Sequence, residues 1–142
     1  MTRSHTDLSE SLNSLEGEDW GDPDYGSYVV RTAHALRRKR LCDLTDEELR
    51  LALSQRIGIP YILDLAFFRL RLNPFIGGDF YNGDIIATLV LAEQGIWRDR
   101  PELAAELPEL LQSALDLAEG DEFSGGMLRD AIGRPVGPDA LN

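Results

Sequence analysis

The sequence predicts an all-α fold, a compact single-domain bundle of about five helices with acidic, partly mobile termini. Through the middle of the chain, apolar residues recur every three or four positions, which is the spacing of a buried helix face. Helix-start and helix-stop residues separate these apolar stretches. The length of 142 residues, with 43% hydrophobic and 27% charged residues, fits one soluble globular domain. We therefore expect a helical domain over residues 28–120, a flexible acidic arm over 1–27 and a tail over 121–142.

The arm and the first helix are predicted from what they can bury. Residues 1–27 are rich in Ser, Asp, Glu and Gly and contain few large apolar residues besides Trp20 and Tyr25, so we expect a mobile arm. Apolar spacing predicts a first helix over about 27–38, which ends in the basic cluster Arg37-Arg38-Lys39-Arg40. A nucleic-acid patch is one interpretation of that cluster. Because no aromatic residues are interleaved with the cations, we expect a solvated helix end that the helix dipole favours.

The next two helices are predicted from their end signals. Thr45 can cap a helix whose third residue, Glu48, completes a capping box. Gly58 is a good left-handed stop for this helix, and Pro60 suits the first turn of the following one, which ends at Asn73-Pro74. The same order of helix, glycine and helix occurs in DNA-binding helix-turn-helix motifs. Here the second helix would present mainly apolar side chains, which favours a protein core over a DNA groove.

A loop with several polar residues follows, over about 75–84. Asn82-Gly83 could form a hairpin turn, but the apolar spacing after it favours a helix over 83–92 that Asn82 or Asp79 caps. Asp79 and Asp84 could also form a metal site or an acid–base pair. Because no third ligand, His or Cys lies near them in the sequence, we expect these carboxylates to cap instead.

The last predicted helix spans about 101–119 and carries an acidic surface. Pro101 suits its first turn, whereas Pro108 either kinks the helix or begins a second one. The tail after it has enough apolar residues for one short docked helix. The acids of this region lie mostly off the apolar stripe and form what we call the acidic ridge. Its members are Glu102, Glu106, Glu109, Asp116, Glu119, Asp121 and Glu122.

The formal net charge of −11 at pH 7 is concentrated at the two ends of the chain. Residues 1–30 contain seven acids and one base, and residues 102–142 contain nine acids and two bases. Nucleic acids and anionic membranes draw their affinity from Lys and Arg, so this acidity disfavours both as partners. It favours a basic protein, because long-range attraction would accelerate its approach.

The sequence contains few of the motifs and residue types that are common in active sites. The chain has no phosphate-binding glycine loop and no zinc or serine-hydrolase motif, and its only histidines are His5 and His34. We expect no enzyme activity, cofactor, metal or small-molecule substrate. An enzyme would need Asp64, Asp79 or Asp84 buried in a cleft with a raised pKa. Cys42 is the only cysteine and no secretory signal begins the sequence, which together indicate a reducing cytoplasm.

The ordered combination of motifs between Arg31 and Trp97 is similar to immunity proteins of bacterial contact-dependent growth inhibition (CDI) systems. The resemblance covers about half of the chain and departs from the pattern at Arg40, Asp64 and Asn82, where relatives more often carry proline. It implies a small cytoplasmic protein that binds a toxin domain delivered by a neighbouring cell. Many such toxins are basic nucleases. The residues that carry the resemblance include Asp43-Leu44-Thr45, Glu47-Glu48-Leu49-Arg50, Gly58, Tyr61, Asn73-Pro74 and Gly78-Asp79-Phe80-Tyr81.

The resemblance also separates expected fold residues from expected contact residues. Each immunity protein must reject non-cognate toxins, so its contact residues have to differ between pairs. We therefore expect the acidic ridge, and after it the arm, to bind the toxin domain in a heterodimer. An acidic adaptor for another basic protein is the alternative. The residues expected to build the fold are Thr45, Glu48, Gly58, Pro60, Asp79, Phe80, Tyr81, Gly83 and Asp84.

Overall fold

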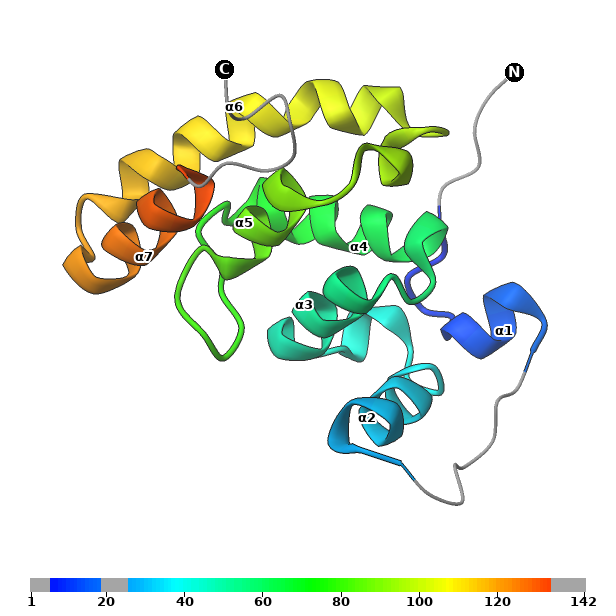
Figure 1. Cartoon of the computed structure of the whole chain (residues 1–142). Helices are drawn as coiled ribbons and strands as arrows, with labels where there is room; N and C mark the ends of the chain where they lie inside the picture. Colours follow the sequence, from blue (N-terminus) through cyan, green and yellow to red (C-terminus); the bar gives the residue numbers. More distant parts are fainter. Residues whose placement is uncertain (1–5, 19–25, 134–142) are drawn as a thin grey trace. The chain divides into compact units, whose positions relative to one another are not determined.

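The protein is all-α in the computed structural model, which describes residues 6–18 and 26–133 (Figure 1), and the predicted fold class is confirmed. Contacts divide the chain into two compact units, Met1–Phe68 and Arg69–Asn142, with the division inside α4. No described helix is long and apolar enough to cross a membrane. The elements in the described residues are α1 (Leu12–Glu16), α2 (Tyr28–Leu36), η1 (Leu41–Asp43), α3 (Asp46–Gln55), α4 (Ile59–Leu72), α5 (Asp84–Leu91), η2 (Gln94–Trp97), α6 (Pro101–Ala118) and α7 (Glu122–Ile132).

Helix α1 lies where the sequence suggested a mobile arm, and the structure differs from that expectation over residues 8–16. The backbone N–H of Asn13 donates to the carbonyl of Arg37 over 3.0 Å, and the N–H of Leu41 donates to the carbonyl of Glu10 over 2.9 Å. Leu12 is fully buried, and a Cβ added at Gly58 would lie 2.4 Å from its Cδ2 atom. One leucine and a backbone pairing with a distant segment therefore hold this stretch. Residues 1–5 and 19–25, with His5, Trp20 and Tyr25, lie outside the described part.

Helix α2 begins at the N-cap Ser27 and agrees with the predicted first helix. The basic cluster at its end is solvated at Arg38, Lys39 and Arg40, as expected, but not at Arg37. Arg37 is buried, donates from Nε to Asn13 Oδ1 over 3.1 Å and pairs with Glu16. Lys39 and Arg40 also form ion pairs, the second of them with Asp43. Most of this positive charge is therefore neutralised by contacts within the N-terminal unit.

Helices α3 and α4 confirm most of the predicted end signals. Thr45 is the N-cap of α3 in a complete capping box, and Pro60 lies in the first turn of α4. The predicted left-handed stop of α3, Gly58, is wrong, because the residue that ends the helix is Arg56, two positions earlier. The helix stops at Gln55 because Arg56 itself adopts the left-handed conformation, with φ of 57°. Gly58 is a second left-handed residue, φ 59°, in the turn that leads into α4.

The C-terminal unit is built from α5, α6 and α7, which pack against one another (Figure 1). Helix α6 runs through Pro108 as a single element, so the proline begins no second helix. Helix α7 is the short helix allowed for in the tail, and its Leu128 is buried. Gly125 lets α7 approach α6 closely, because a Cβ there would lie 2.6 Å from the carbonyl oxygen of Ala118. Five predicted helices thus correspond to α2–α6, and α1 and α7 are additional.

Candidate functional site

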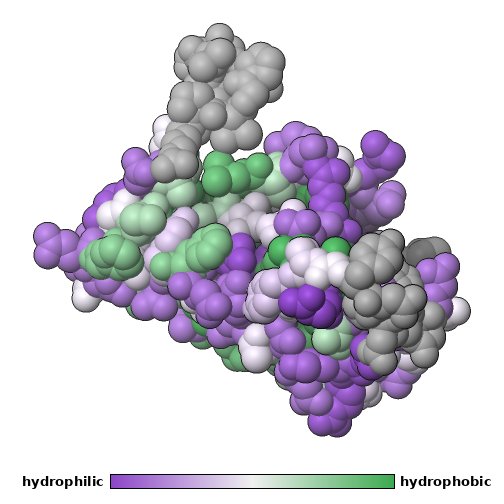
Figure 2. Space-filling view, turned by 60° about the horizontal axis from the view of Figure 1, so that its bottom comes forward, coloured by the Kyte–Doolittle hydropathy of each residue, from purple (hydrophilic) through white to green (hydrophobic). Residues whose placement is uncertain are grey.

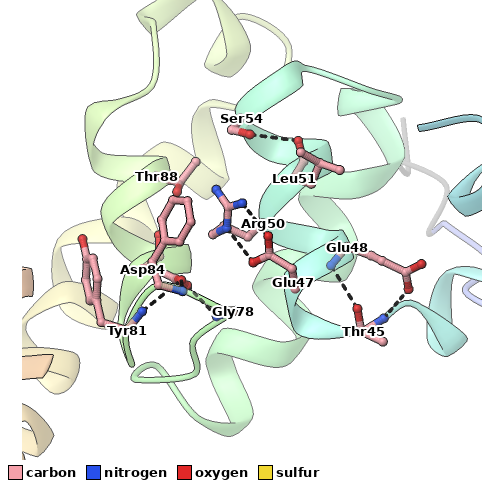
Figure 3. Close-up of polar contacts among 11 residues, drawn as sticks. Thr45, Glu47, Glu48, Arg50, Leu51, Ser54, Gly78, Tyr81, Asp84 and Thr88 are labelled. Carbon is pink, nitrogen blue, oxygen red and sulfur yellow. Dashed lines mark hydrogen bonds and ion pairs between the residues drawn. The ribbon is translucent and has the colours of Figure 1, made fainter. Parts of the chain in front are cut away.

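Asp84 organises the loop that precedes α5. Its buried carboxylate accepts hydrogen bonds from the backbone N–H groups of Gly78 (2.6 Å), Phe80 (3.1 Å) and Tyr81 (3.4 Å), as Figure 3 shows in part. Gly83 is the N-cap of α5, and no side chain caps it. The predicted capping by Asn82 or Asp79 is therefore wrong. Instead, the carboxylate of Asp84, the first residue of α5, accepts hydrogen bonds from the loop and so ties the loop to the helix.

The start of α3 is a second polar cluster, in the N-terminal unit. The Thr45 hydroxyl accepts from the N–H of Glu48 over 3.0 Å, and the Glu48 carboxylate accepts from the N–H of Thr45 over 2.8 Å (Figure 3). Lys39 donates to the same carboxylate over 2.9 Å. Beside it, Arg50 is buried and makes a two-fold hydrogen bond to Glu47. All these groups are satisfied by one another, which is the behaviour of a structural cluster.

The charge of Glu48 makes this capping box dependent on pH. Burial raises the pKa of its carboxyl group, but hydrogen bonds from Thr45 and Lys39 outweigh burial and hold the pKa below its ordinary value of 4.5. A lowered pKa in the folded state means that the ionised form stabilises the fold. That stabilisation is complete above pH 4.5 and is lost as the pH falls through the lower folded pKa.

We expect Glu48→Gln to lower the free energy of unfolding by about 1 kcal/mol at pH 7. The amide oxygen can still accept from the Thr45 N–H, but the negative charge that pairs with Lys39 and is favoured at a helix N-terminus is lost. The difference from wild type should shrink as the pH falls below 4.5. Urea unfolding at a series of pH values measures it. Glu119→Gln, at an exposed position, is the control and should stay within about 0.5 kcal/mol of wild type throughout. A Glu48 difference that is the same at low and neutral pH would contradict this assignment.

The carboxylates of the acidic ridge differ in whether they already have hydrogen-bond partners within the protein. Arg71 makes two hydrogen bonds of 2.7 Å to Glu106, and they lower the pKa of that carboxyl group. Asp121 is the N-cap of α7, and hydrogen bonds from the Ser124 N–H and from Asn82 lower its pKa. Glu102 accepts from Arg100, and Asp116 accepts from Gln112. The ridge members that are exposed and whose carboxylates have no polar contact among the described residues are Glu109, Glu119 and Glu122.

Five large apolar side chains in the described part of the C-terminal unit are exposed, namely Leu72 at the end of α4, Phe80, Leu117, Phe123 and Met127. The sequence did not identify the last four as a group. Phe80 was expected to build the fold, yet its ring is on the surface. Leu117 lies on α6 and is also exposed. Phe123 and Met127 stand four residues apart on α7, so they share one face of that helix. The sequence signal that could have identified this group is the four-residue spacing of Phe123 and Met127. That spacing places both side chains on one face of α7, while the neighbouring Leu128 is buried.

The three carboxylates considered for catalysis have different surroundings. Asp84 accepts backbone hydrogen bonds, Asp64 is half-buried and accepts from the Thr6 hydroxyl over 2.5 Å, and Asp79 is exposed. Cys42 is exposed too. Within residues 6–18 and 26–133, no three His, Cys, Asp or Glu side chains come close enough to hold a metal ion.

A polar cavity of about 420 Å³ opens in the N-terminal unit. Its lining includes Glu16, Glu18, Arg37 and Arg56, so it presents both signs of charge. Arg37 is already paired with Glu16. The cavity therefore lacks the apolar walls with a few convergent polar groups that are typical of small-molecule sites.

Comparison with known proteins places the chain in a family. No curated protein and no solved structure matches it. The family model of CDI immunity proteins matches residues 14–107, about two thirds of the chain. The matched range runs from within α1 to the first half of α6 and contains the loop that Asp84 holds. Because this match extends over more than half of the sequence, the chain belongs to the family of CDI immunity proteins.

Proposed function

We propose that this immunity protein acts in the cytoplasm, without catalysis, by covering the active or substrate-binding site of one cognate toxin domain. Family membership supports the general role, which is to neutralise a CDI toxin. The net charge of −11 supports the further step that this toxin is a basic nuclease. A nuclease binds phosphates through Lys and Arg, and an acidic inhibitor can pair with those side chains.

Glu109, Glu119 and Glu122 are the ridge carboxylates best placed for such pairing. Each is exposed, whereas Glu106 and Asp121 already serve contacts within the C-terminal unit. A standard interface of about 1,600 Å² would cover such a group of charges together with neighbouring apolar surface. Exposed charges at an interface rim act mainly on the association rate, because they steer the encounter of the two proteins.

The first test is co-expression of the protein with the toxin domain encoded by the neighbouring gene. We expect growth rescue and co-purification of a heterodimer. Growth arrest together with a failure to co-purify would refute the proposed partner. The toxin's own activity on DNA and RNA, with and without the immunity protein, then distinguishes a nuclease from another enzyme and shows whether its active site is blocked.

Neutralising the three unpaired carboxylates tests the acidic ridge. We expect the triple variant Glu109→Gln, Glu119→Gln, Glu122→Gln to associate about tenfold more slowly at low salt, with a weaker salt dependence. Stopped-flow or surface-plasmon measurements at several salt concentrations provide both quantities. The control is a triple variant with the same change of net charge at exposed positions outside the ridge, namely Asp43→Asn, Glu93→Gln and Asp99→Asn. Equal slowing in both variants would show that net charge, not the ridge, attracts the toxin.

A further inference from the structure

Four of the exposed apolar residues of the C-terminal unit lie on α6, on α7 and on the loop that is hydrogen-bonded to α7, and we call them the apolar patch. The patch consists of Phe80, Leu117, Phe123 and Met127, which are between 41% and 69% exposed. Single apolar residues on a surface are ordinary, whereas a group of large ones marks a place where another molecule binds. In Figure 2, apolar atoms gather on the part of the surface that carries α7.

Hydrogen bonds bring the parts of the apolar patch to the same end of the C-terminal unit. The backbone N–H of Asn82 donates to the Ser124 hydroxyl over 3.0 Å, and its side-chain amide donates to Asp121 over 3.1 Å. These contacts tie the loop that carries Phe80 to the first turn of α7. Leu117 lies in the last turn of α6, and its carbonyl accepts from the N–H of Gly120 in the turn between the helices.

The patch is preorganised, which favours binding. Asp84 holds the N–H of Phe80 over 3.1 Å, and Asp121 caps the helix that carries Phe123 and Met127. Aromatic side chains on a rigid backbone lose little conformational freedom when they bind. The two exposed phenyl rings, Phe80 and Phe123, are therefore suited to be anchors of an interface.

The surroundings of the patch are acidic. Residues 101–133 contain eight acids and a single base, Arg129. Asp116, Glu119 and Glu122 are exposed within a few residues of Leu117 and Phe123. An apolar centre with a negative rim is complementary to a partner that has an apolar hollow with Lys or Arg around it. Such cations would also gain from the faces of the exposed phenyl rings.

We propose that the apolar patch is the centre of the interface with the toxin domain, with the acidic rim opposite basic residues of the toxin. This inference rests on the proposed function and names the surface that performs it. A second copy of this chain fits less well, because a two-fold contact would bring the same acidic rims together. An anionic membrane is repelled by the same rim.

Most of the apolar patch lies outside the part of the chain that the family model matches. Three of the four patch residues, Leu117, Phe123 and Met127, lie outside the matched range 14–107, whereas Phe80 lies inside it. Cognate recognition requires contact residues that can differ between members of a family. The helices that the match contains can then build a shared framework, while α7 supplies contacts particular to one toxin.

The test uses the full-length protein and its co-encoded toxin domain. We expect Phe123→Ala and Phe80→Ala each to raise the dissociation constant about 30-fold. Most of the change should be faster dissociation, because an anchor residue stabilises the formed complex and has little effect on the association rate. Their thermal unfolding midpoints should stay near that of wild type, because both rings are exposed in the free protein. The matched control is Tyr28→Ala, which removes a ring that is 65% exposed on α2 and should change the dissociation constant less than twofold.

The outcomes separate this inference from the proposed function. If wild type neither binds nor neutralises the toxin, the proposed function fails. If wild type binds the toxin and both phenylalanine variants bind it equally well, the apolar patch is not the interface, although the proposed function stands. The same conclusion follows if Tyr28→Ala weakens binding as much as the phenylalanine variants do. Sedimentation equilibrium measures whether the protein dimerises. A wild-type dimer that Phe123→Ala abolishes would show that the patch mediates self-association, and would refute it as the toxin-binding site.

Discussion

Replacing Asp84 by alanine is expected to lower the free energy of unfolding by about 3 kcal/mol, because three backbone N–H groups lose the carboxylate that accepts their hydrogen bonds. A hydrogen bond to a charged group contributes about 1.5–3 kcal/mol, and a buried donor left without an acceptor adds a desolvation cost. The contributions of the three bonds are not additive, since one carboxylate serves all of them. Urea unfolding followed by circular dichroism measures the change.

Two further variants show whether the acceptor itself is responsible. Asp84→Asn keeps the shape and one acceptor oxygen but points an amide at a donor, so we expect a loss of about 2 kcal/mol. Asp99→Ala removes an exposed carboxylate of the same unit and should change stability by less than about 0.5 kcal/mol. If Asp84→Ala behaved like Asp99→Ala, the loop before α5 would have to be held by other contacts.

Leu12→Ala is expected to cost about 3 kcal/mol, within the usual range of about 2–5 kcal/mol for truncating a fully buried leucine. Its side chain lies close to Gly58, and the neighbouring backbone is hydrogen-bonded to residues 37–42. Little can therefore move in to fill the cavity. Thermal and urea unfolding both report this loss.

Leu72→Ala is the matched control, because it makes the same chemical change at a side chain that is 75% exposed. It should lie within about 0.5 kcal/mol of wild type. A cost for Leu12→Ala as small as that of the control would mean that residues 8–16 behave as the mobile arm expected from composition. Proteolysis within residues 8–16 would then be fast in wild type, and slow if Leu12 is part of the core.

The helices that were predictable are those with local signals. The capping box at Thr45, Pro60 after the turn and the apolar spacing before Asn73-Pro74 all act within a few residues, so they can be read without knowing the fold. Helix α1 could not be found in this way. Its support is a set of hydrogen bonds to residues about thirty positions later, together with one buried leucine.

The candidate site was predictable only in part. The acidity of α6 and α7 is a property of composition, and it identified the region correctly as negative. Which of its carboxylates are available depends on partners distant in sequence, such as Arg71 for Glu106 and Asn82 for Asp121. The exposure of Phe80 could not be foreseen either, because an apolar residue in a loop is more often expected to pack.

By itself, the sequence determined the all-α class, most helix limits, the acidic character and the resemblance to CDI immunity proteins, because each follows from residue types at short spacing. The tertiary structure alone decided that Arg37 is buried, that Asp84 turns back to hold a loop, and that Phe80 and Phe123 stay exposed. These outcomes depend on which surfaces pack together. Burial and pairing between distant segments are properties of the folded chain, and no local pattern encodes them.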